Sequence, residues 1–304
     1  MDKKNIFLSK IDDFLDKKTL KNKVIVVYWP TACWKTSLWI DIAKYLNTEI
    51  ISTDSRQIFK YLDIWTGKAT LDEMQWIKHH FIDIINPSEE YSVWEFKKQA
   101  LKIINDLHKN WKIPILVWWT GLYIDSLIYD FDIPSSPSDK NLRFELEQKA
   151  KEFWKEYVWN ILNEIDPEYA KTVHYNNLNY VIRWIEVKKI TWLSKLDFKQ
   201  EKKLKFETLF LTPYDNDREK LYNKINLRVA QMFENGLIDE VKSILKMWYT
   251  KNDFWLKTIW YTEVLDYLDW KISLVQAISI VSQHNRNYAK RQLTWFRNYE
   301  KIAE

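Results

Sequence analysis

The stretch that decides the fold is VIVVYWPTACWKTS, residues 24–37. Its first five residues are β-branched or aromatic, a run typical of a buried strand in a parallel sheet. The segment from Ser37 to Leu46 that follows has the apolar pattern of a helix. The loop between them ends in Lys35 and Thr36, close to the start of a helix, where backbone N–H groups attract anions. The stretch therefore predicts a strand, an anion-binding loop and a helix in succession.

The glycine and tryptophan counts of the chain are abnormal. It holds three glycines and eighteen tryptophans in 304 residues, whereas a chain of this length ordinarily has roughly 21 glycines. Several tryptophans occupy places where the backbone calls for glycine, the default residue for positive φ and close backbone approach. Among them are Trp29, Trp34, Trp118, Trp119 and Trp270. We hypothesise that the gene encodes glycine by UGA, translated here as tryptophan, at every tryptophan except Trp295; a protein truly rich in tryptophan is the alternative.

With glycine at positions 29 and 34, residues 29–36 read GPTACGKT, the G-x-x-x-x-G-K-T pattern of a phosphate-binding loop. In such a loop the backbone N–H groups wrap a diphosphate, the lysine adds charge and the threonine hydroxyl can hold Mg²⁺. A chance Lys-Thr pair at a helix start is the alternative. The predicted loop consists of Trp29, Pro30, Thr31, Ala32, Cys33, Trp34, Lys35 and Thr36, with Mg²⁺ at Thr36.

Further strands and helices alternate along the chain. Strands are predicted at Glu49–Thr53, Lys112–Trp118 and Phe206–Leu211, and a helix from Tyr91 to His108. Such alternation predicts an α/β fold, a phosphate-loop parallel sheet flanked by helices. A proline- and serine-rich break at residues 134–138 opens a helical, charge-rich stretch. We therefore expect three parts: a charged extension over 1–23, a core formed by 24–132 with 206–304, and a helical insertion over 133–205. A basic helix, Ser273–Asn298, is predicted to close the core.

Composition restricts the class of protein. Hydrophobic residues at 46% and charged residues at 29% are typical of a globular protein. No run of about 18 apolar residues is present, so no membrane span is expected. The single cysteine excludes an internal disulfide and fits a reducing cytoplasm. A net charge of +4 is too small to identify a nucleic-acid binder.

Six motifs follow the loop in order. They are DSRQIF (54–59), LDIWTGK (62–68), HHFID (79–83), WWTGLY (118–123), DPEYA (166–170) and YAKRQLTWFR (288–297). With glycine restored, this set resembles the tRNA dimethylallyltransferase (tRNA isopentenyltransferase) family over about residues 24–298. The resemblance implies transfer of a dimethylallyl group from dimethylallyl diphosphate to the exocyclic amine of the adenosine 3′ of the anticodon, with release of diphosphate.

The resemblance also implies roles for individual residues. The loop of residues 29–36 would grip the diphosphate, and Asp54 would accept a hydrogen bond and then a proton from the amine. Thr120 would position the base, while Arg228, Lys35 and Mg²⁺ would stabilise the departing diphosphate. Structural alternatives remain for each: a helix cap for Asp54, a turn residue for Thr120 and a surface arginine for Arg228.

The partner implied is the anticodon stem-loop of tRNA. The basic residues of the last helix are spaced to form a phosphate-facing stripe, although a solvated charged face is the alternative. The residues implied to contact tRNA are Asp54, Ser55, Arg56, Gln57, Thr120, Arg143, Asn179, Tyr180, Val181, Ile182, Arg183, Lys257, Thr258, Ile259, Trp260, Tyr261, Thr262, Lys290, Arg291, Gln292, Leu293, Thr294, Trp295, Phe296 and Arg297.

Other functions fit parts of the sequence. A phosphate-binding loop also occurs in ATP-binding small-molecule kinases, where an aspartate at 54 could be the base for a substrate hydroxyl. A prenyltransferase of related fold could act on free adenine nucleotides. An inactive RNA-binding remnant is a fourth possibility if the tryptophans are real. His79 and His80 are expected to be structural, because no cysteine or third histidine stands near them. A cytoplasmic monomer is expected.

Overall fold

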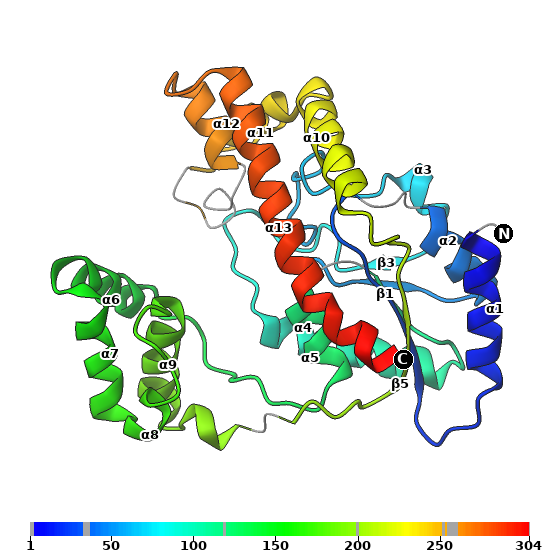
Figure 1. Ribbon diagram of the computed structural model, residues 1–304, viewed down its shortest axis with the longest axis horizontal. Helices are drawn as coiled ribbons and strands as arrows, with labels where there is room; N and C mark the ends of the chain where they lie inside the picture. The colour runs from blue at the N-terminus through cyan, green and yellow to red at the C-terminus, as the bar shows by residue number, and fades with distance from the viewer. Residues whose placement is uncertain are drawn as a thin grey trace. The chain divides into compact units, whose positions relative to one another are not determined.

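The computed structural model describes residues 3–32, 37–117, 120–198, 201–250, 253 and 261–303, the side chains of residues 3 and 303 excepted (Figure 1). A parallel sheet of strand order β3-β2-β4-β1-β5 forms its centre. The strands are β1 (Lys23–Val27), β2 (Ile50–Ser52), β3 (His79–His80), β4 (Ile115–Val117) and β5 (Glu207–Leu211). Ile25 of β1 lies between Ile115 of β4 and Leu209 of β5. The predicted α/β fold with a parallel sheet is confirmed.

The helices lie between and after these strands. In the first part of the chain they are α1 (Lys3–Asp16), α2 (Ser37–Tyr45), α3 (Leu71–Met74), α4 (Val93–Lys109) and α5 (Gly121–Ile128). Next come α6 (Lys140–Glu152), α7 (Trp154–Ile165), α8 (Pro167–Ala170), α9 (Leu178–Thr191) and the 3₁₀ helix η1 (Lys195–Asp197). The last are α10 (Arg218–Glu234), α11 (Leu237–Lys246), α12 (Tyr261–Leu268) and α13 (Leu274–Ala303). None of the helices in these described segments has the length and apolar content needed to cross a bilayer.

Local chemistry explains several element boundaries. Helix α4 begins after Ser92, whose hydroxyl accepts the Glu95 N–H while the Glu95 carboxylate accepts the Ser92 N–H. This capping box places the start two residues later than the apolar pattern predicted. Strand β4 is shorter than predicted, because it begins only after Pro114, which has no N–H to donate to a ladder. Val24, Ile25, Val26 and Val27 of β1 are fully buried, as their apolar run predicted.

The first helix is part of the folded core. Phe7, Ile11 and Phe14 of α1 are buried, and their spacing of four and three residues places them on one helical face. The helix packs against β5, and Lys17, just after the helix, forms an ion pair with Glu207 of that strand. Helix α1 therefore has a buried apolar face, and its described charged residues lie on the remaining surface of the helix.

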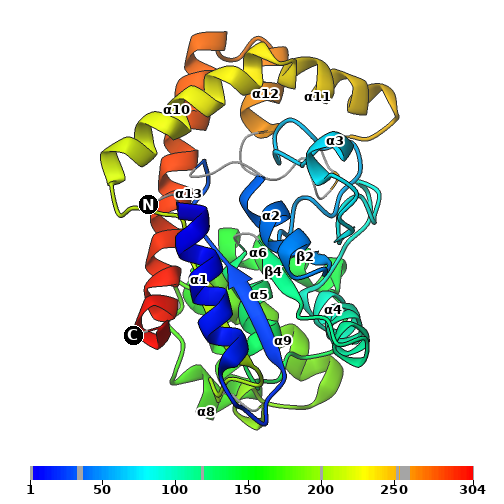
Figure 2. The ribbon, with the colours of Figure 1, turned by 90° about the vertical axis from the view of Figure 1, so that its right-hand side faces the viewer.

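Helix α13 connects distant parts of the core. Its first half packs against α10 and α12, and further along it packs against α5 and β5 (Figures 1 and 2). Phe296 and Tyr299 of α13 contact the ring of Tyr28, the residue that follows β1. This packing brings a conspicuous motif of the C-terminal helix close to the carboxyl end of the central strand.

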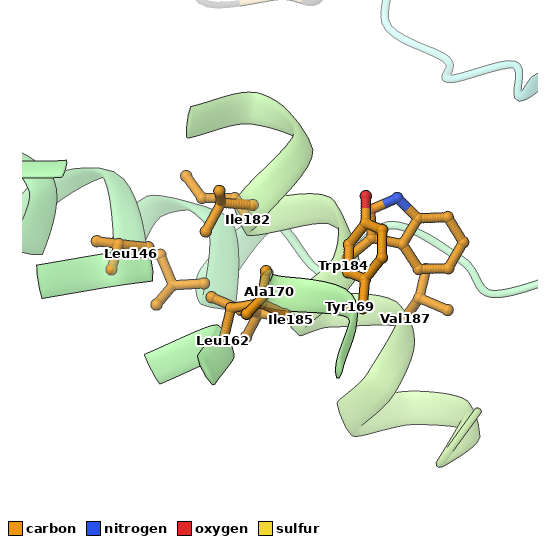
Figure 3. Close-up of a cluster of buried hydrophobic side chains, with 10 residues drawn as sticks. Leu146, Leu162, Tyr169, Ala170, Ile182, Trp184, Ile185 and Val187 are labelled. Carbon is orange, nitrogen blue, oxygen red and sulfur yellow. The ribbon is translucent and has the colours of Figure 1, made fainter. Parts of the chain in front are cut away.

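Residues 129–203 form a second compact unit, and the first unit consists of residues 1–128 with 204–304. The second unit is helical and has its own apolar core, drawn in Figure 3, where the Tyr169 and Trp184 rings meet edge to face. Glu186 is fully buried in this unit and bound to Arg143 and Arg183. Apolar packing and one shared carboxylate thus stabilise the unit from within.

The backbone bears directly on the tryptophan count. Six tryptophans have φ between 58° and 71°, the left-handed region that side chains rarely adopt. All six rings are exposed, at 81% to 101% of their full area. The six are Trp76, Trp111, Trp154, Trp192, Trp248 and Trp270. Bulky indoles in strained, solvent-facing turns are what glycine positions translated as tryptophan would give.

Candidate functional site

The carboxyl ends of three neighbouring strands, β1, β2 and β4, form the candidate site. Ligands of open α/β sheets bind at such an edge. The Thr53 N–H donates to the Val117 carbonyl at 2.8 Å, and the Thr120 N–H donates to the Thr53 carbonyl at 3.3 Å. These bonds bring Asp54, which follows β2, close to Thr120, which follows β4. Residues 29–32, the start of the predicted phosphate loop, follow β1 at the same edge.

Asp54 is a buried carboxylate, with 1% of its surface exposed. Its Oδ1 accepts the Arg56 N–H at 2.7 Å. Burial raises its pKa to about 6, although the Arg56 N–H and guanidinium, the Gln57 N–H and the Arg228 charge each act to lower it. A carboxylate in this state is ionised at neutral pH yet accepts a proton far more readily than an exposed one. The bond to Arg56 caps a local turn, so the capping role and a chemical role coexist at Asp54.

Thr120 is held close to the Asp54 segment by Ser55, the residue that follows Asp54. The Ser55 N–H donates to Thr120 Oγ1 at 3.1 Å, and the two hydroxyls are 3.4 Å apart. The Thr120 hydroxyl also hydrogen-bonds Tyr288, a phenol whose pKa is raised by burial and by the Asp54 charge. Tyr288 is not among the site residues predicted from the sequence, although its place at the start of the YAKRQLTWFR motif is a signal for it.

Arg228 is a partly buried residue of α10, not a surface arginine. Its Nη1 donates to Thr31 Oγ1 at 3.4 Å, so it reaches the beginning of the phosphate-loop stretch. Burial lowers its pKa to about 10, with the Asp54 charge acting in the opposite direction. The guanidinium stays charged at neutral pH. A cation thus lies near both Asp54 and Thr31.

The structure describes the first half of the predicted phosphate loop, residues 29–32. Trp29 is buried and stacks on Trp39 of α2, with ring centroids 4.7 Å apart. The Thr31 N–H donates to Gln292 Oε1 of α13 at 3.0 Å, and Ala32 has φ of 65°. Cys33, Trp34, Lys35 and Thr36, with Trp118 and Trp119, lie outside the described residues.

Gln57 faces the interior, so direct contact of its side chain with tRNA is not supported. Its side chain is fully buried and donates to the carbonyls of Thr66 and Gly67 at 3.3 and 3.4 Å. Its Oε1 accepts the Ser52 hydroxyl at 3.3 Å. A fully hydrogen-bonded buried amide fixes the turn that ends in Gly67.

Within the second unit, the expected tRNA residues divide into three groups. Arg143 and Arg183 both bind Glu186, whose pKa falls because these hydrogen bonds, with one from the Asp139 N–H, outweigh its burial. Val181 and Ile182 are buried in the apolar core. Asn179 and Tyr180 are exposed. The buried Val181 and Ile182 therefore hold α9 in place, and this helix exposes Asn179 and Tyr180.

Helix α13 exposes part of its motif and buries the rest. Gln292 and Phe296 are buried, and Leu293 is partly buried. A Cβ added to Gly121 would lie 2.7 Å from Cε2 of Trp295, so this indole packs on a bare α-carbon. That contact fits a genuine tryptophan at 295. The exposed residues of the motif are Lys290, Arg291, Thr294, Trp295 and Arg297.

The region before α12 is only partly described. Lys257, Thr258, Ile259 and Trp260 lie outside the described residues. Tyr261 is buried, and its hydroxyl donates to Glu240 at 2.9 Å. Thr262 is exposed.

The two histidines of the HHFID motif have structural partners. His80 Nε2 lies 2.7 Å from a Glu49 oxygen, and His79 Nδ1 lies 2.8 Å from the Ile77 carbonyl. Burial lowers the pKa of both rings, which favours their neutral forms. Among the residues that the structure describes, no group of three or more His, Cys, Asp or Glu side chains could hold a metal.

A surface hollow of 490 Å³ lies elsewhere on the molecule. Lys23, at the amino end of β1, and Ile113, before β4, are among its lining residues. This is the opposite edge of the sheet from Asp54. The hollow is therefore separate from the candidate site.

The chain is similar to proteins named tRNA dimethylallyltransferase over nearly its whole length. A family model described as IPP transferase matches residues 57–299. The tRNA dimethylallyltransferase of Alkaliphilus oremlandii is 47% identical over 93% of this chain and 91% of that protein. That of Acetivibrio thermocellus is 45% identical over 92% of this chain and 90% of the relative.

Solved structures agree with these matches. The full-length tRNA isopentenylpyrophosphate transferase of Bacillus halodurans matches with a TM-score of 0.65 and 38% identity, over 91% of this chain and 88% of that one. A eukaryotic dimethylallyltransferase acting on tRNA matches with a TM-score of 0.73 and 30% identity, over 90% and 70% of the two chains.

Proposed function

We propose that this chain, which belongs to the IPP transferase family, transfers a dimethylallyl group from dimethylallyl diphosphate to tRNA. The acceptor is the exocyclic amine of the adenosine 3′ of the anticodon, and diphosphate is released. The observation that carries the proposal is the buried Asp54 carboxylate, which lies near the Arg228 charge and is followed by Ser55, whose N–H binds Thr120. Membership of this family supports a phosphate-binding role for residues 29–36.

The reaction exchanges one bond for another. The C–O bond of the donor breaks, with its electron pair leaving on the diphosphate, and an N–C bond forms to the adenosine. The amine is a weak nucleophile, so we assign Asp54 to accept its hydrogen bond and then its proton. With a pKa of about 6, Asp54 is ionised at neutral pH and ready for that step.

The departing diphosphate needs positive charge beside it. Arg228 already reaches Thr31 at 3.4 Å, so its guanidinium lies where a diphosphate held by the loop would gather charge. Lys35 would add a second cation from within the loop. Magnesium would be held by the Thr36 hydroxyl and diphosphate oxygens, hard donors that suit it, and would neutralise further charge.

The RNA must present an unstacked base to this edge. Thr120, fixed by Ser55 and Tyr288, would orient the base. The exposed Lys290, Arg291 and Arg297 would bind phosphates of the stem-loop. Because one chain supplies these groups, we propose that it acts as a monomer, in the cytoplasm where tRNA is modified.

Diphosphate release tests the proposal. The protein with glycine at positions 29, 34, 118 and 119 should release diphosphate only when tRNA and dimethylallyl diphosphate are both present. Release with free adenosine monophosphate in place of tRNA would favour the nucleotide prenyltransferase. ADP formation from ATP and a small alcohol, without modified tRNA, would establish the kinase instead.

A further inference from the structure

The turn that ends in Gly67 lies directly against Arg228. A Cβ added to Gly67 would lie 3.2 Å from Cζ of Arg228 and would overlap its Nη2 outright. The guanidinium therefore rests on a bare α-carbon, and any other residue at 67 would occupy its place. Gly67 also has φ of 59°, but the close approach is the feature that separates it from an ordinary turn glycine.

The turn under Arg228 is itself fixed from the Asp54 segment. Gln57, three residues after Asp54, donates to the carbonyls of Thr66 and Gly67 and is fully buried. The Gly67 N–H donates to the Ile64 carbonyl at 3.2 Å. The backbone that supports Arg228 is thus tied by hydrogen bonds to the segment that carries Asp54.

We infer that Gly67 is a positioning residue, which seats the Arg228 guanidinium between the Asp54 carboxylate and Thr31. The inference rests on the proposed function for its catalytic meaning. The atoms that a Cβ would displace belong to the far end of a flexible side chain, so the fold can absorb the change while Arg228 moves. Gly67→Ala should consequently damage the reaction more than the fold.

The chain offers a matched control. Gly236, before α11, has φ of 97°, so alanine there also meets the backbone strain of a positive φ. A Cβ at Gly236 would meet only Ile64 Cδ1, at 4.0 Å, an ordinary contact. Gly236→Ala therefore reproduces the strain without touching Arg228.

The first readout is the pKa of Asp54, measured by carbon NMR of labelled aspartate and assigned with Asp54→Asn. Among the residues that the structure describes, Arg56, Arg228, Tyr123 and Tyr288 are the titratable side chains near this carboxylate. Moving the Arg228 cation away should raise the Asp54 pKa by about half a unit or more. Gly67→Ala should do this, as should Arg228→Ala, and Gly236→Ala should leave the value unchanged. An unchanged pKa in Gly67→Ala would overturn the inference.

The second readout is turnover by the glycine-restored enzyme. Gly67→Ala should lower kcat about 10- to 100-fold, with little change in the KM for tRNA. In an Arg228→Ala background the same change should have almost no further effect, because the two act through one group. Independent, multiplying losses, or an equal loss in Gly236→Ala, would refute the positioning role. If no variant prenylates tRNA, the proposed function fails, and the NMR titration still decides the role of Gly67.

Discussion

Replacing the six left-handed tryptophans by glycine should stabilise the protein. The substituted positions are Trp76, Trp111, Trp154, Trp192, Trp248 and Trp270, whose φ values lie between 58° and 71°. Strain from a side chain in this region destabilises the folded state by about 1–2 kcal/mol per residue. Glycine removes this strain, but it makes the unfolded chain more flexible and so offsets roughly 0.5–1 kcal/mol of the gain. The indoles are 81% to 101% exposed, so little packing is lost.

The net expectation is about 0.5–1 kcal/mol per site, or about 3–6 kcal/mol for the sixfold variant if the distant sites add. Urea unfolding followed by circular dichroism measures the difference between the two chains. Trp295→Gly is the control of opposite sign, because that indole lies in α13 against Gly121 and its loss should destabilise. A sixfold variant no more stable than the parent would refute the idea that glycine belongs at these positions.

The remaining predictions concern replacements of charged side chains. Asp54→Asn should lower turnover by about 10²-fold or more, and residual activity near the parent level would leave Asp54 a structural cap. The same change should raise the free energy of unfolding at pH 7 by about 2–3 kcal/mol. This gain should develop as the pH rises from about 4 to 6. In that window Asp54 of the parent becomes ionised in the unfolded chain before it does so in the folded protein, because burial raises its folded-state pKa to about 6. Replacing Lys290 and Arg291 by alanine should weaken tRNA binding and reduce the log–log salt slope by up to about 0.9 per lost contact; an unchanged slope would place them away from the RNA. Glu186→Gln should destabilise the second unit by about 2–3 kcal/mol, seen as faster limited proteolysis of residues 129–203, and an unchanged rate would show that the shared carboxylate contributes little.

The sequence predicts those features that depend on local pattern. The apolar run of β1 and the positions of Asp54 and Thr120 after their strands follow from residues adjacent in the chain. A parallel sheet then brings those strand ends to one edge, so the meeting of Asp54 with Thr120 follows from topology.

Contacts between residues far apart in the chain cannot be predicted from local sequence patterns. Gln292 accepts the Thr31 N–H across 261 residues, and Arg143 finds Glu186 across 43. The spacing of residues in the sequence does not show which arginine pairs with which buried carboxylate, because tertiary packing brings the two partners together. Gln57 likewise stands in a motif with exposed-type residues, yet its hydrogen bonds to the Gly67 turn make it interior.

The most direct test of the central claim is the chemistry left on the RNA. The chain with glycine at 29, 34, 118 and 119 would be incubated with dimethylallyl diphosphate and unmodified tRNA, and the digested nucleosides identified by mass spectrometry. We expect an adenosine heavier by one isopentenyl group at the position 3′ of the anticodon, and we expect Asp54→Asn to form it at a rate lower by about 10²-fold or more. Unmodified adenosine there, from a folded protein that binds both substrates, would contradict it.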